Sequence, residues 1–456
     1  MNLSVENLQN WYDQNQTQII DDFFTFLRFK GISTDPVFHK DCRDTAGFLV
    51  DYLHHIGMHA VLWENPGLPV VFAEHQVGAD KPTVLIYQHY DVQPVDPLEL
   101  WDSDPFEPNI RDGKVYARGA SDNKGQCFAS IIALKAILEM SKDHPVNIKL
   151  FIEGEEESGG AGTSITLAEK KDQLKADYVL VVDFDMPRES QPGITLGMRG
   201  IATFNVECQN ARQDLHSGIH GGIALNPLRA LCEVFAKMWD ENGTIAIDHF
   251  YDDMIPFSAQ ELQKISFIFD KPAYVKDFGV KAFCNEKDRS IKESNWLRPA
   301  LEINGLWGGY TGSGFKTVIP AKAYAKISCR LISGQNPEKI ENIIRFFLQK
   351  NIASGIDVQV TAHHSAEAFC TSPDAKIVQI IAKSQKDVFG IDPEFTLCGA
   401  SVPIVTSLAE VSGAEVALFG TSLSSDDFHS PNEHFGLDRF KQGFLTMARI
   451  LAHLGE

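Results

Sequence analysis

The chain has 456 residues, more than one hydrophobic core usually supports, so we expect two domains or one domain with a large insertion. Hydrophobic residues make up 44% of the chain and charged residues 22%, which is typical of a soluble globular protein. The formal net charge of -20 argues against binding to nucleic acid or to an anionic membrane, because both would be repelled.

The first part of the chain alternates between helical and extended patterns. Apolar residues at helical spacing predict helices over 7–30 and 41–56. The elements predicted after them are strands at 59–63, 70–73 and 83–87, a helix at 126–140, a strand at 147–152, a helix at 165–171 and a strand at 178–182. This alternation predicts an α/β domain with a mixed, largely parallel sheet flanked by helices. Its functional groups should lie at the carboxyl ends of the strands.

The pattern changes from Gly197 onward. The predicted elements are strands at 201–208, 322–331 and 358–362 and helices at 227–239 and 337–349, with an irregular excursion at roughly 244–320. The α/β alternation then resumes with helices at 374–388, 402–410 and 437–454 and strands at 394–397 and 415–419. We therefore predict one domain from residues 1–199 and 368–456, and an inserted α+β domain at 200–367.

Cysteines and the N-terminal residues indicate the compartment. Eight cysteines are scattered without a Cys-x-x-Cys pair, which indicates reduced thiols rather than disulfides or a thiolate zinc site. Residues 1–18 lack the basic and apolar segments of a secretion signal. No apolar run approaches about 18 residues, the length that a membrane-spanning helix needs. We expect a cytoplasmic protein without a membrane span.

Acidic and imidazole side chains gather at predicted strand ends. Four glutamates, Glu153 and Glu155–Glu157, follow the strand at 147–152, although such a cluster alone is more often a solvated loop. His89 and Asp91 end another strand as His-x-Asp, so both side chains point the same way and the carboxylate can steady a metal-binding imidazole. From this motif alone, a structural histidine is the more common explanation.

Three further residues complete a possible metal set. Asp122 lies in a glycine-flanked turn before a helix, where a structural helix cap is an equal alternative. Asp183 directly follows a strand, and Asp185 competes with it because strand alternation lets both face one side. His429 adds a second imidazole. Imidazoles and carboxylates without a thiolate suit zinc or manganese in an open, catalytic site.

Seven motifs carry a family resemblance. They are VLIYQHYDVQP at 84–94, RGASDNKGQ at 118–126, EGEEESG at 153–159, DLHSG at 214–218, RLISGQ at 330–335, GASVP at 399–403 and HSPNE at 429–433. In order and spacing they resemble the dinuclear-zinc metallopeptidase family of carnosinases, aminoacylases, glutamate carboxypeptidases and succinyl-diaminopimelate desuccinylases. The resemblance covers nearly the whole chain and is closest to the carnosinase-like dipeptidase branch. The motifs at 330–335 and 399–403 depart slightly from that branch, which often has Arg-Leu-Val-Pro and Gly-Gly-Ser there.

This resemblance implies a fold and a metal site. The fold would be a zinc exopeptidase-like catalytic domain with an inserted, ferredoxin-like α+β domain for lid closure and dimerisation. Two divalent metal ions, zinc or alternatively manganese, would be bridged by Asp122. His89 and Asp183 would hold one ion, and Glu157 and His429 the other. The physical logic agrees, since two cations about 3.5–4 Å apart can share a bridging carboxylate and a water.

The resemblance also implies catalytic roles. Glu156 would be the general base, which takes a proton from the attacking water and returns it to the leaving amine. Asp91 would orient His89. His216 would reach the active site of a partner subunit and stabilise the oxyanion, which implies a homodimer. From the residues alone, a loop histidine bonded to its own backbone explains His216 equally well.

Arg330 is the candidate clamp for a substrate carboxylate, because guanidinium binds carboxylate in a bidentate fork. Gly399 and Ser401 are candidate donors to the same carboxylate, although a tight turn explains them equally. The leading hypothesis is a metal-dependent hydrolase that cleaves the amide bond of dipeptides or short peptides next to a free C-terminal carboxylate. Two alternatives stay open: an N-acyl amino acid deacylase or desuccinylase, and a non-catalytic binding homologue, which the complete ligand set disfavours.

Overall fold

The computed structural model describes residues 3–141, 146–284 and 286–455. They form two compact units: unit 1 comprises Met1–Leu196, Thr371–Thr396 and Ser407–Glu456, and unit 2 comprises Gly197–Cys370 and Leu397–Thr406. The units therefore change at 196/197 and 370/371, a few residues from the predicted boundaries at 199/200 and 367/368. Residues 397–406, predicted to lie in the first domain, cluster with unit 2, because the side chain of Arg199 holds the Gly399 carbonyl and that of Arg330 holds Ser401.

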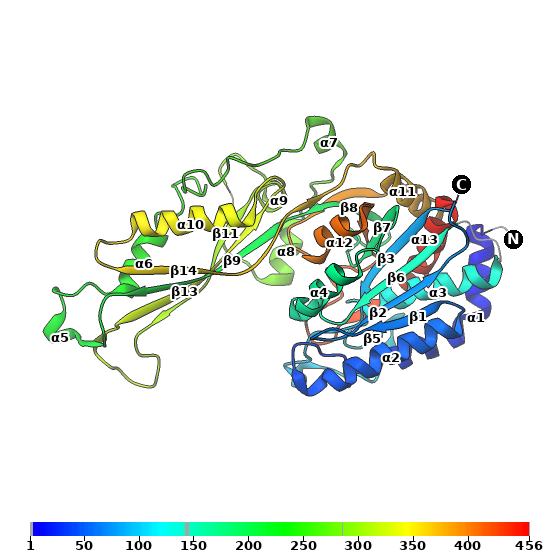
Figure 1. Ribbon diagram of the computed structural model, residues 1–456, viewed down its shortest axis with the longest axis horizontal. Helices are drawn as coiled ribbons and strands as arrows, with labels where there is room; N and C mark the ends of the chain where they lie inside the picture. Colours follow the sequence, from blue (N-terminus) through cyan, green and yellow to red (C-terminus); the bar gives the residue numbers. More distant parts are fainter. Residues whose placement is uncertain (1–2, 142–145, 285, 456) are drawn as a thin grey trace. The chain divides into compact units, whose positions relative to one another are not determined.

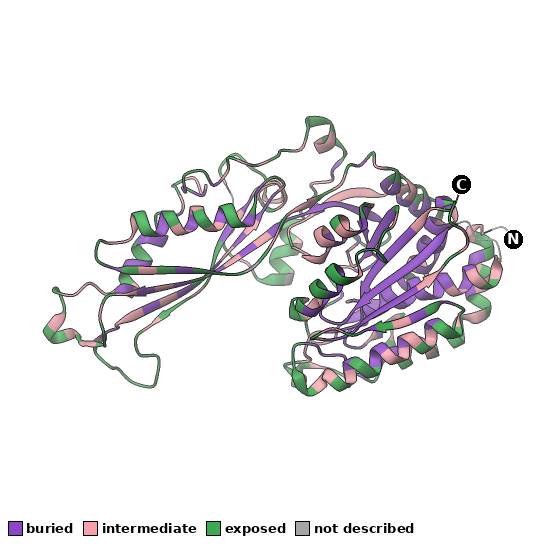
Figure 2. Ribbon diagram, viewed as in Figure 1, coloured by how far each residue is buried: buried purple, intermediate pink, exposed green. Residues whose placement is uncertain are grey.

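The core of unit 1 is a mixed sheet with the strand order β1-β2-β6-β3-β7-β17-β8 (Figure 1). Its central strands run parallel: β6 (Asn147–Glu153), β3 (Thr83–His89), β7 (Tyr178–Val182) and β17 (Glu415–Phe419). The flanking strands are antiparallel: β1 (His59–Trp63), β2 (Val70–His75) and β8 (Gly193–Met198). Every residue of β6 and β7 is buried, as expected for parallel strands covered on both faces (Figure 2).

Helices enclose this sheet. They are α1 (Val5–Leu27), α2 (His39–His55), α3 (Lys124–Met140), α4 (Ala161–Lys170), α11 (Lys376–Phe389), α12 (Ile404–Ser412) and α13 (Leu437–Leu454). Helix α3 packs against β3, α1 and α13, and it is apolar on nearly all sides because it has neighbours all round. Helix α2 runs to His55, and Gly57 adopts the left-handed conformation (φ 95°) just beyond it. Among the described residues, no helix is both long enough and apolar enough to cross a membrane.

A small three-stranded sheet brings two distant parts of unit 1 together. Its order is β18-β5-β4, with β18 (His434–Gly436), β5 (Lys114–Tyr116) and β4 (Asn109–Arg111). Strand β18 directly follows Glu433, and β5 lies just before Arg118. Because His434 pairs with Tyr116, Glu433 lies beside the segment that begins at Arg118. Three single-turn helices complete the unit: η1 (Pro36–Phe38), η2 (Leu98–Leu100) and η3 (Glu156–Ser158).

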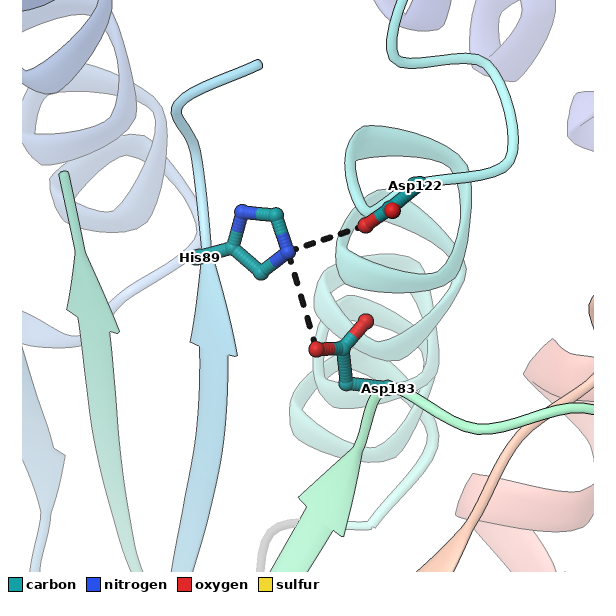
Figure 3. A group of neighbouring side chains, drawn as sticks. All are labelled: His89, Asp122 and Asp183. Carbon is teal, nitrogen blue, oxygen red and sulfur yellow. Dashed lines mark hydrogen bonds and ion pairs between the residues drawn. The ribbon is translucent and has the colours of Figure 1, made fainter. Parts of the chain in front are cut away.

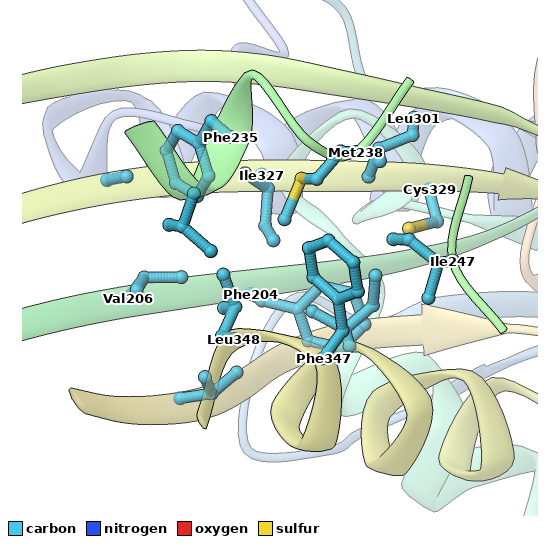
Figure 4. Close-up of a cluster of buried hydrophobic side chains, with 14 of the residues drawn as sticks. Phe204, Val206, Phe235, Met238, Ile247, Leu301, Ile327, Cys329, Phe347 and Leu348 are labelled. Atoms are coloured by element: carbon cyan, nitrogen blue, oxygen red, sulfur yellow. The ribbon is translucent and has the colours of Figure 1, made fainter. Parts of the chain in front are cut away.

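Unit 2 has its own sheet and core. The antiparallel order is β11-β13-β9-β14, with β11 (Ala300–Gly308), β13 (Lys322–Leu331), β9 (Gly200–Gln209) and β14 (Asp357–Ala366). Burial alternates along β9 and β13, so one face turns inward. Against that face pack α6 (Pro227–Phe235) and α10 (Pro337–Asn351). Phe204, Phe235, Ile327 and Leu348 lie at the centre of the buried cluster (Figure 4).

The mixed α/β fold class is confirmed, but the irregular excursion predicted at 244–320 is wrong in part. It contains β11, α7 (Ala259–Lys264), α8 (Lys271–Phe278) and α9 (Ile291–Trp296). The sequence of β11 does not alternate regularly between apolar and polar residues, because its pairing with β13 shifts register between Ile303 and Gly305. The remaining short elements are β10 (Leu215–His216), β12 (Val318–Ile319), α5 (Ser217–His220), β15 (Phe369–Cys370) and β16 (Glu394–Cys398).

Candidate metal centre

Two groups of potential metal ligands meet at one edge of the unit 1 sheet. His89 is the last residue of β3, Asp183 directly follows β7, and Glu157 lies in η3, just after β6. Strands β6, β3 and β7 are parallel neighbours, so their carboxyl ends share this edge. Asp122 reaches the same edge from the turn before α3.

The first group consists of His89, Asp122 and Asp183 (Figure 3). The Nε2 atom of His89 lies 3.1 Å from Oδ1 of Asp122 and 3.6 Å from Oδ2 of Asp183. In each group one candidate ligand atom per residue lies within 4.8 Å of the others. The buried imidazole and the two carboxylates therefore converge on one small volume.

The second group consists of Asp122, Glu157 and His429. The Nε2 atom of His429 lies 2.9 Å from Oδ2 of Asp122 and 3.1 Å from Oε1 of Glu157. Because Oδ1 of Asp122 faces His89, the two oxygens of this one carboxylate serve different groups. A carboxylate shared in this way suits a two-metal site.

The ionisable groups at this edge shift one another's pKa values. Burial works to raise the pKa of Asp122, but hydrogen bonds from His429 and His89 outweigh it and hold that pKa below its usual range. The same contacts with Asp122 and Glu157 raise the pKa of His429 to about 10. Burial raises the pKa values of Glu157 and Asp183. Two imidazoles and three crowded carboxylates without a thiolate fit a pair of divalent cations.

Asp91 lies between the two groups. Its main-chain oxygen lies 3.0 Å from Nδ1 of His89, and its Oδ1 lies 3.4 Å from the same nitrogen. Its other carboxylate oxygen accepts a hydrogen bond of 3.0 Å from the backbone N–H of Glu157. The structure thus places Asp91 where it contacts His89, as the sequence predicts, and adds a contact to the second group that the sequence did not indicate.

Two amide side chains that the sequence analysis did not single out hold the carboxylates. Asn123 donates to Oδ1 of Asp183 at 2.7 Å and to the carbonyl oxygen of Val182 at 2.8 Å. Gln93 donates to Oε2 of Glu157 at 2.7 Å. Both amides lie inside motifs that carry the family resemblance, and that position was the only signal that could have identified them.

Glu433 organises the loop that carries Asp122. This fully buried carboxylate accepts hydrogen bonds from the backbone N–H groups of Gly119, Ser121 and Asp122, at 2.8, 2.9 and 3.0 Å. It also accepts one from Nη1 of Arg118 at 2.8 Å. Since the sheet of β18 and β5 brings Glu433 to this loop, a residue near His429 in sequence fixes the backbone of the shared ligand.

The members of the glutamate cluster have different environments. Among the described residues, the Glu156 carboxylate has no hydrogen-bond partner. Burial raises its pKa, His89 acts in the opposite direction, and Asp183 and Glu157 raise it further. Glu153 is buried and accepts a hydrogen bond from the Tyr87 hydroxyl. Glu155 is also buried and accepts one from the N–H of Thr163, so neither of these two is solvated.

Asp183, not Asp185, belongs to the metal-ligand groups of the described residues. Asp185 instead pairs with Ser422 in an isolated β-bridge. The alternation argument left both residues possible, because it describes direction along the strand and not distance from the other ligands.

The predicted substrate-binding residues lie together in unit 2. Nη1 of Arg330 donates to Oγ of Ser401 at 2.9 Å, and the carbonyl oxygen of Gly399 accepts from Nε of Arg199 at 2.8 Å. A Cβ at Gly399 would stand 2.5 Å from Oδ1 of Asn295, so a larger residue there would require the Asn295 side chain to move. Burial lowers the pKa of Arg330, and among the described residues no carboxylate pairs with it. Its guanidinium is thus available for an anion from outside the chain.

His216 lies in unit 2, at the end of β10, where it is exposed. Its Nδ1 accepts a hydrogen bond of 3.0 Å from the N–H of Gly218 and caps α5. This contact is the one expected for a loop histidine that is bonded to its own backbone, the alternative given in the sequence analysis. Neither metal-ligand group of the described residues contains His216, and its role in a partner's site stays a prediction.

Known proteins resemble this chain over nearly its full length. A family model described as peptidase family M20/M25/M40 matches residues 85–453. A Cys-Gly metallodipeptidase of Schizosaccharomyces pombe is 28% identical over 99% of this chain and 99% of its own length. The Beta-Ala-His dipeptidase of Homo sapiens is 29% identical over 98% of this chain and 93% of its own.

A solved structure agrees with these sequence relatives. An M20 family metallo-carboxypeptidase from Sulfolobus solfataricus superposes with a TM-score of 0.86 and 30% identity, covering 96% of this chain and 99% of that one. The match spans both units, and it extends the agreement from the motifs to the fold that positions them. The family resemblance predicted from the sequence is thereby confirmed, and the chain belongs to peptidase family M20/M25/M40.

Proposed function

We propose that this protein is a dinuclear metallodipeptidase that hydrolyses the amide bond of dipeptides or short peptides next to a free C-terminal carboxylate. One observation carries the proposal: Asp122 presents one oxygen to His89 and the other to His429, so a single carboxylate joins two metal-ligand groups. Glu156 lies in η3, the turn that also carries Glu157.

In this proposal His89, Asp122 and Asp183 hold one divalent cation, and Asp122, Glu157 and His429 hold the other. We propose zinc, with manganese as the alternative, because both accept imidazole and carboxylate ligands. When bound, such a pair supplies Lewis-acid chemistry, which polarises the amide carbonyl and lowers the pKa of a water from about 15.7 to roughly 7.

Glu156 performs the proton transfers. It accepts the proton of the attacking water and then donates it to the nitrogen of the leaving amine, a role that typically contributes about 10² to 10⁴ in rate. Its position suits this role, because it lies in η3 directly before the metal-ligand candidate Glu157. Asp91 supports the transfer by holding His89 through its main-chain oxygen.

Arg330 binds the C-terminal carboxylate of the substrate. Its half-buried guanidinium, which has no carboxylate partner among the described residues, can offer a bidentate fork, and we propose Gly399 and Ser401 as further donors to the same carboxylate. We further propose that His216 stabilises the oxyanion in the site of a partner subunit, within a homodimer. The exposed position of His216 is compatible with this role. A cytoplasmic location is also proposed; it is supported by the cysteines of the described residues, which form no disulfide.

The names of the relatives favour dipeptides over N-acyl amino acids. The two sequence relatives are dipeptidases for Cys-Gly and for Beta-Ala-His, and the solved structure is a carboxypeptidase. All three activities act beside a free carboxylate. Nothing in the described residues favours the deacylase alternative.

A substrate panel tests the proposal. The protein is stripped with a chelator, reloaded with Zn²⁺ or Mn²⁺, and assayed for amine release from Cys-Gly, Beta-Ala-His, an N-acetyl amino acid and a dipeptide amide. We expect hydrolysis of the free dipeptides after reloading and much slower turnover of the other two. Release of no amine from any substrate would reject the enzyme, and preference for the N-acetyl amino acid would replace the dipeptidase by a deacylase.

A further inference from the structure

Asp183 and Glu157 each belong to one metal-ligand group only, and in each carboxylate the two oxygens have different contacts. Oδ2 of Asp183 faces His89 at 3.6 Å, whereas Oδ1 accepts the hydrogen bond from Asn123 at 2.7 Å. The orientation of the Asn123 amide is settled by its surroundings, because its nitrogen lies between two acceptors, Asp183 Oδ1 and the Val182 carbonyl. One oxygen is thus held by the protein while the other is presented to the first group.

Glu157 repeats this division in the second group. Its Oε1 faces His429 at 3.1 Å, and its Oε2 accepts the hydrogen bond from Gln93 at 2.7 Å. The terminal torsion of a glutamate side chain is broad, so a hydrogen bond to one oxygen restricts the plane of the carboxylate. Gln93 therefore helps to fix the direction in which the other oxygen faces His429.

The two amide side chains have different hydrogen-bond partners. Among the described residues, Asn123 hydrogen-bonds Asp183 and Val182 but not Glu157, and Gln93 hydrogen-bonds Glu157 but not Asp183. No amide side chain of the described residues hydrogen-bonds the Asp122 carboxylate. The side chain of Asp122 contacts the two imidazoles, and its backbone is held by Glu433.

We propose that Asn123 and Gln93 are positioning residues that set the affinity of the two metal positions separately, Asn123 for the His89 position and Gln93 for the His429 position. Glu433, which holds the backbone of the shared ligand, sets both. The inference rests on the proposed function, since it takes the two groups to be metal positions. Hydrogen-bond partners of metal ligands typically change metal affinity by about 10- to 100-fold when removed.

A crossed set of double variants tests this assignment. His429→Ala leaves the His89 position alone, and His89→Ala leaves the other. In the His429→Ala background, Asn123→Ala should weaken Zn²⁺ binding about 10- to 100-fold, and Gln93→Ala should leave it within about threefold. In the His89→Ala background the two effects should exchange. Dissociation constants come from competition with a chromophoric chelator, and visible spectra of Co²⁺-loaded protein report the ligand geometry.

A matched control separates positioning from a general loss of stability. Gln385 is a buried amide in α11 of the same unit and donates to the Gly193 carbonyl oxygen at 3.0 Å. Gln385→Ala removes a comparable side chain away from the site, so it should lower the thermal midpoint of the metal-free protein without changing Zn²⁺ affinity in either background. Glu433→Gln should weaken Zn²⁺ binding in both backgrounds.

The outcomes are distinguishable. The crossed pattern supports the inference. Equal weakening of both positions by each amide variant, unchanged affinity in all of them, or the same weakening in the Gln385→Ala control overturns it. If the unsubstituted protein binds two Zn²⁺ ions and the crossed pattern is absent, only this inference fails. If the unsubstituted protein binds no Zn²⁺, the proposed function fails with it.

Discussion

Two glycines in helices offer a matched test of how tightly the Asp122 loop packs. Gly125 lies in the first turn of α3 and Gly47 in the middle of α2. A Cβ on Gly125 would stand closer than 3.0 Å to the carbonyl oxygen of Ala120 and 2.7 Å from Cδ1 of Phe435. A Cβ on Gly47 would meet no heavy atom of the described residues within 4 Å, apart from its own helix and chain neighbours. The same substitution should therefore have opposite effects at the two positions.

The magnitudes follow from these contacts. Overpacking usually costs about 1–3 kcal/mol, and we expect the upper end, about 3 kcal/mol, for Gly125→Ala because a backbone carbonyl cannot rotate away. Gly47→Ala should stabilise by about 0.5–1 kcal/mol, because alanine loses less conformational entropy than glycine in a helix. Urea denaturation of the metal-free protein, followed by circular dichroism, measures both changes. A Gly125→Ala variant as stable as the unsubstituted protein, or a Gly47→Ala variant destabilised to a similar extent, would refute the reasoning.

Three further changes test the site. Glu156→Gln should lower kcat by about 10² to 10⁴ while the protein still binds two metal ions; an unchanged kcat would remove Glu156 from the proton transfer. Glu433→Gln should destabilise the metal-free protein by about 3–5 kcal/mol in urea denaturation, because it leaves Arg118 buried without its counter-ion, whereas Glu107→Gln at an exposed pair should have little effect. Equal stabilities would contradict the buried-pair argument. Arg330→Lys should lower kcat/KM for free dipeptides about 10- to 100-fold, from the loss of charge-assisted hydrogen bonds of about 1.5–3 kcal/mol, and leave dipeptide amides unaffected; an equal loss for both substrates would exclude a carboxylate clamp.

Much of unit 1 could be read from local patterns. The predicted strands at 59–63, 178–182 and 415–419 and the helix at 437–454 coincide with β1, β7, β17 and α13. Strands β7 and β17 are continuous apolar runs and α13 has its apolar residues at helical spacing, and both patterns depend only on the element itself and on the faces it buries. The strand ends then locate His89 and Asp183 at one edge of a parallel sheet, since parallel neighbours end on the same side.

Local patterns were less informative where contacts set the structure. Strand β11 was missed because a bulge breaks its alternation, and residues 397–406 join unit 2 through hydrogen bonds from Arg199 and Arg330. In both cases the deciding interaction is with a segment far away in the chain. Periodicity carries no information about such partners.

The candidate site divides in the same way. The sequence by itself determined which residue types are present at the strand ends and, through the motifs, which family they resemble. Only the tertiary structure decided that Asp122 lies between His89, 33 residues before it, and His429, 307 residues after it, with a different oxygen toward each. It also decided that Gln93, Asn123 and Glu433 hold the surrounding groups. The physical reason is that a hydrogen bond depends on distances of about 3 Å between side chains, and folding sets such distances by bringing the ends of parallel strands and the β18–β5 pair together.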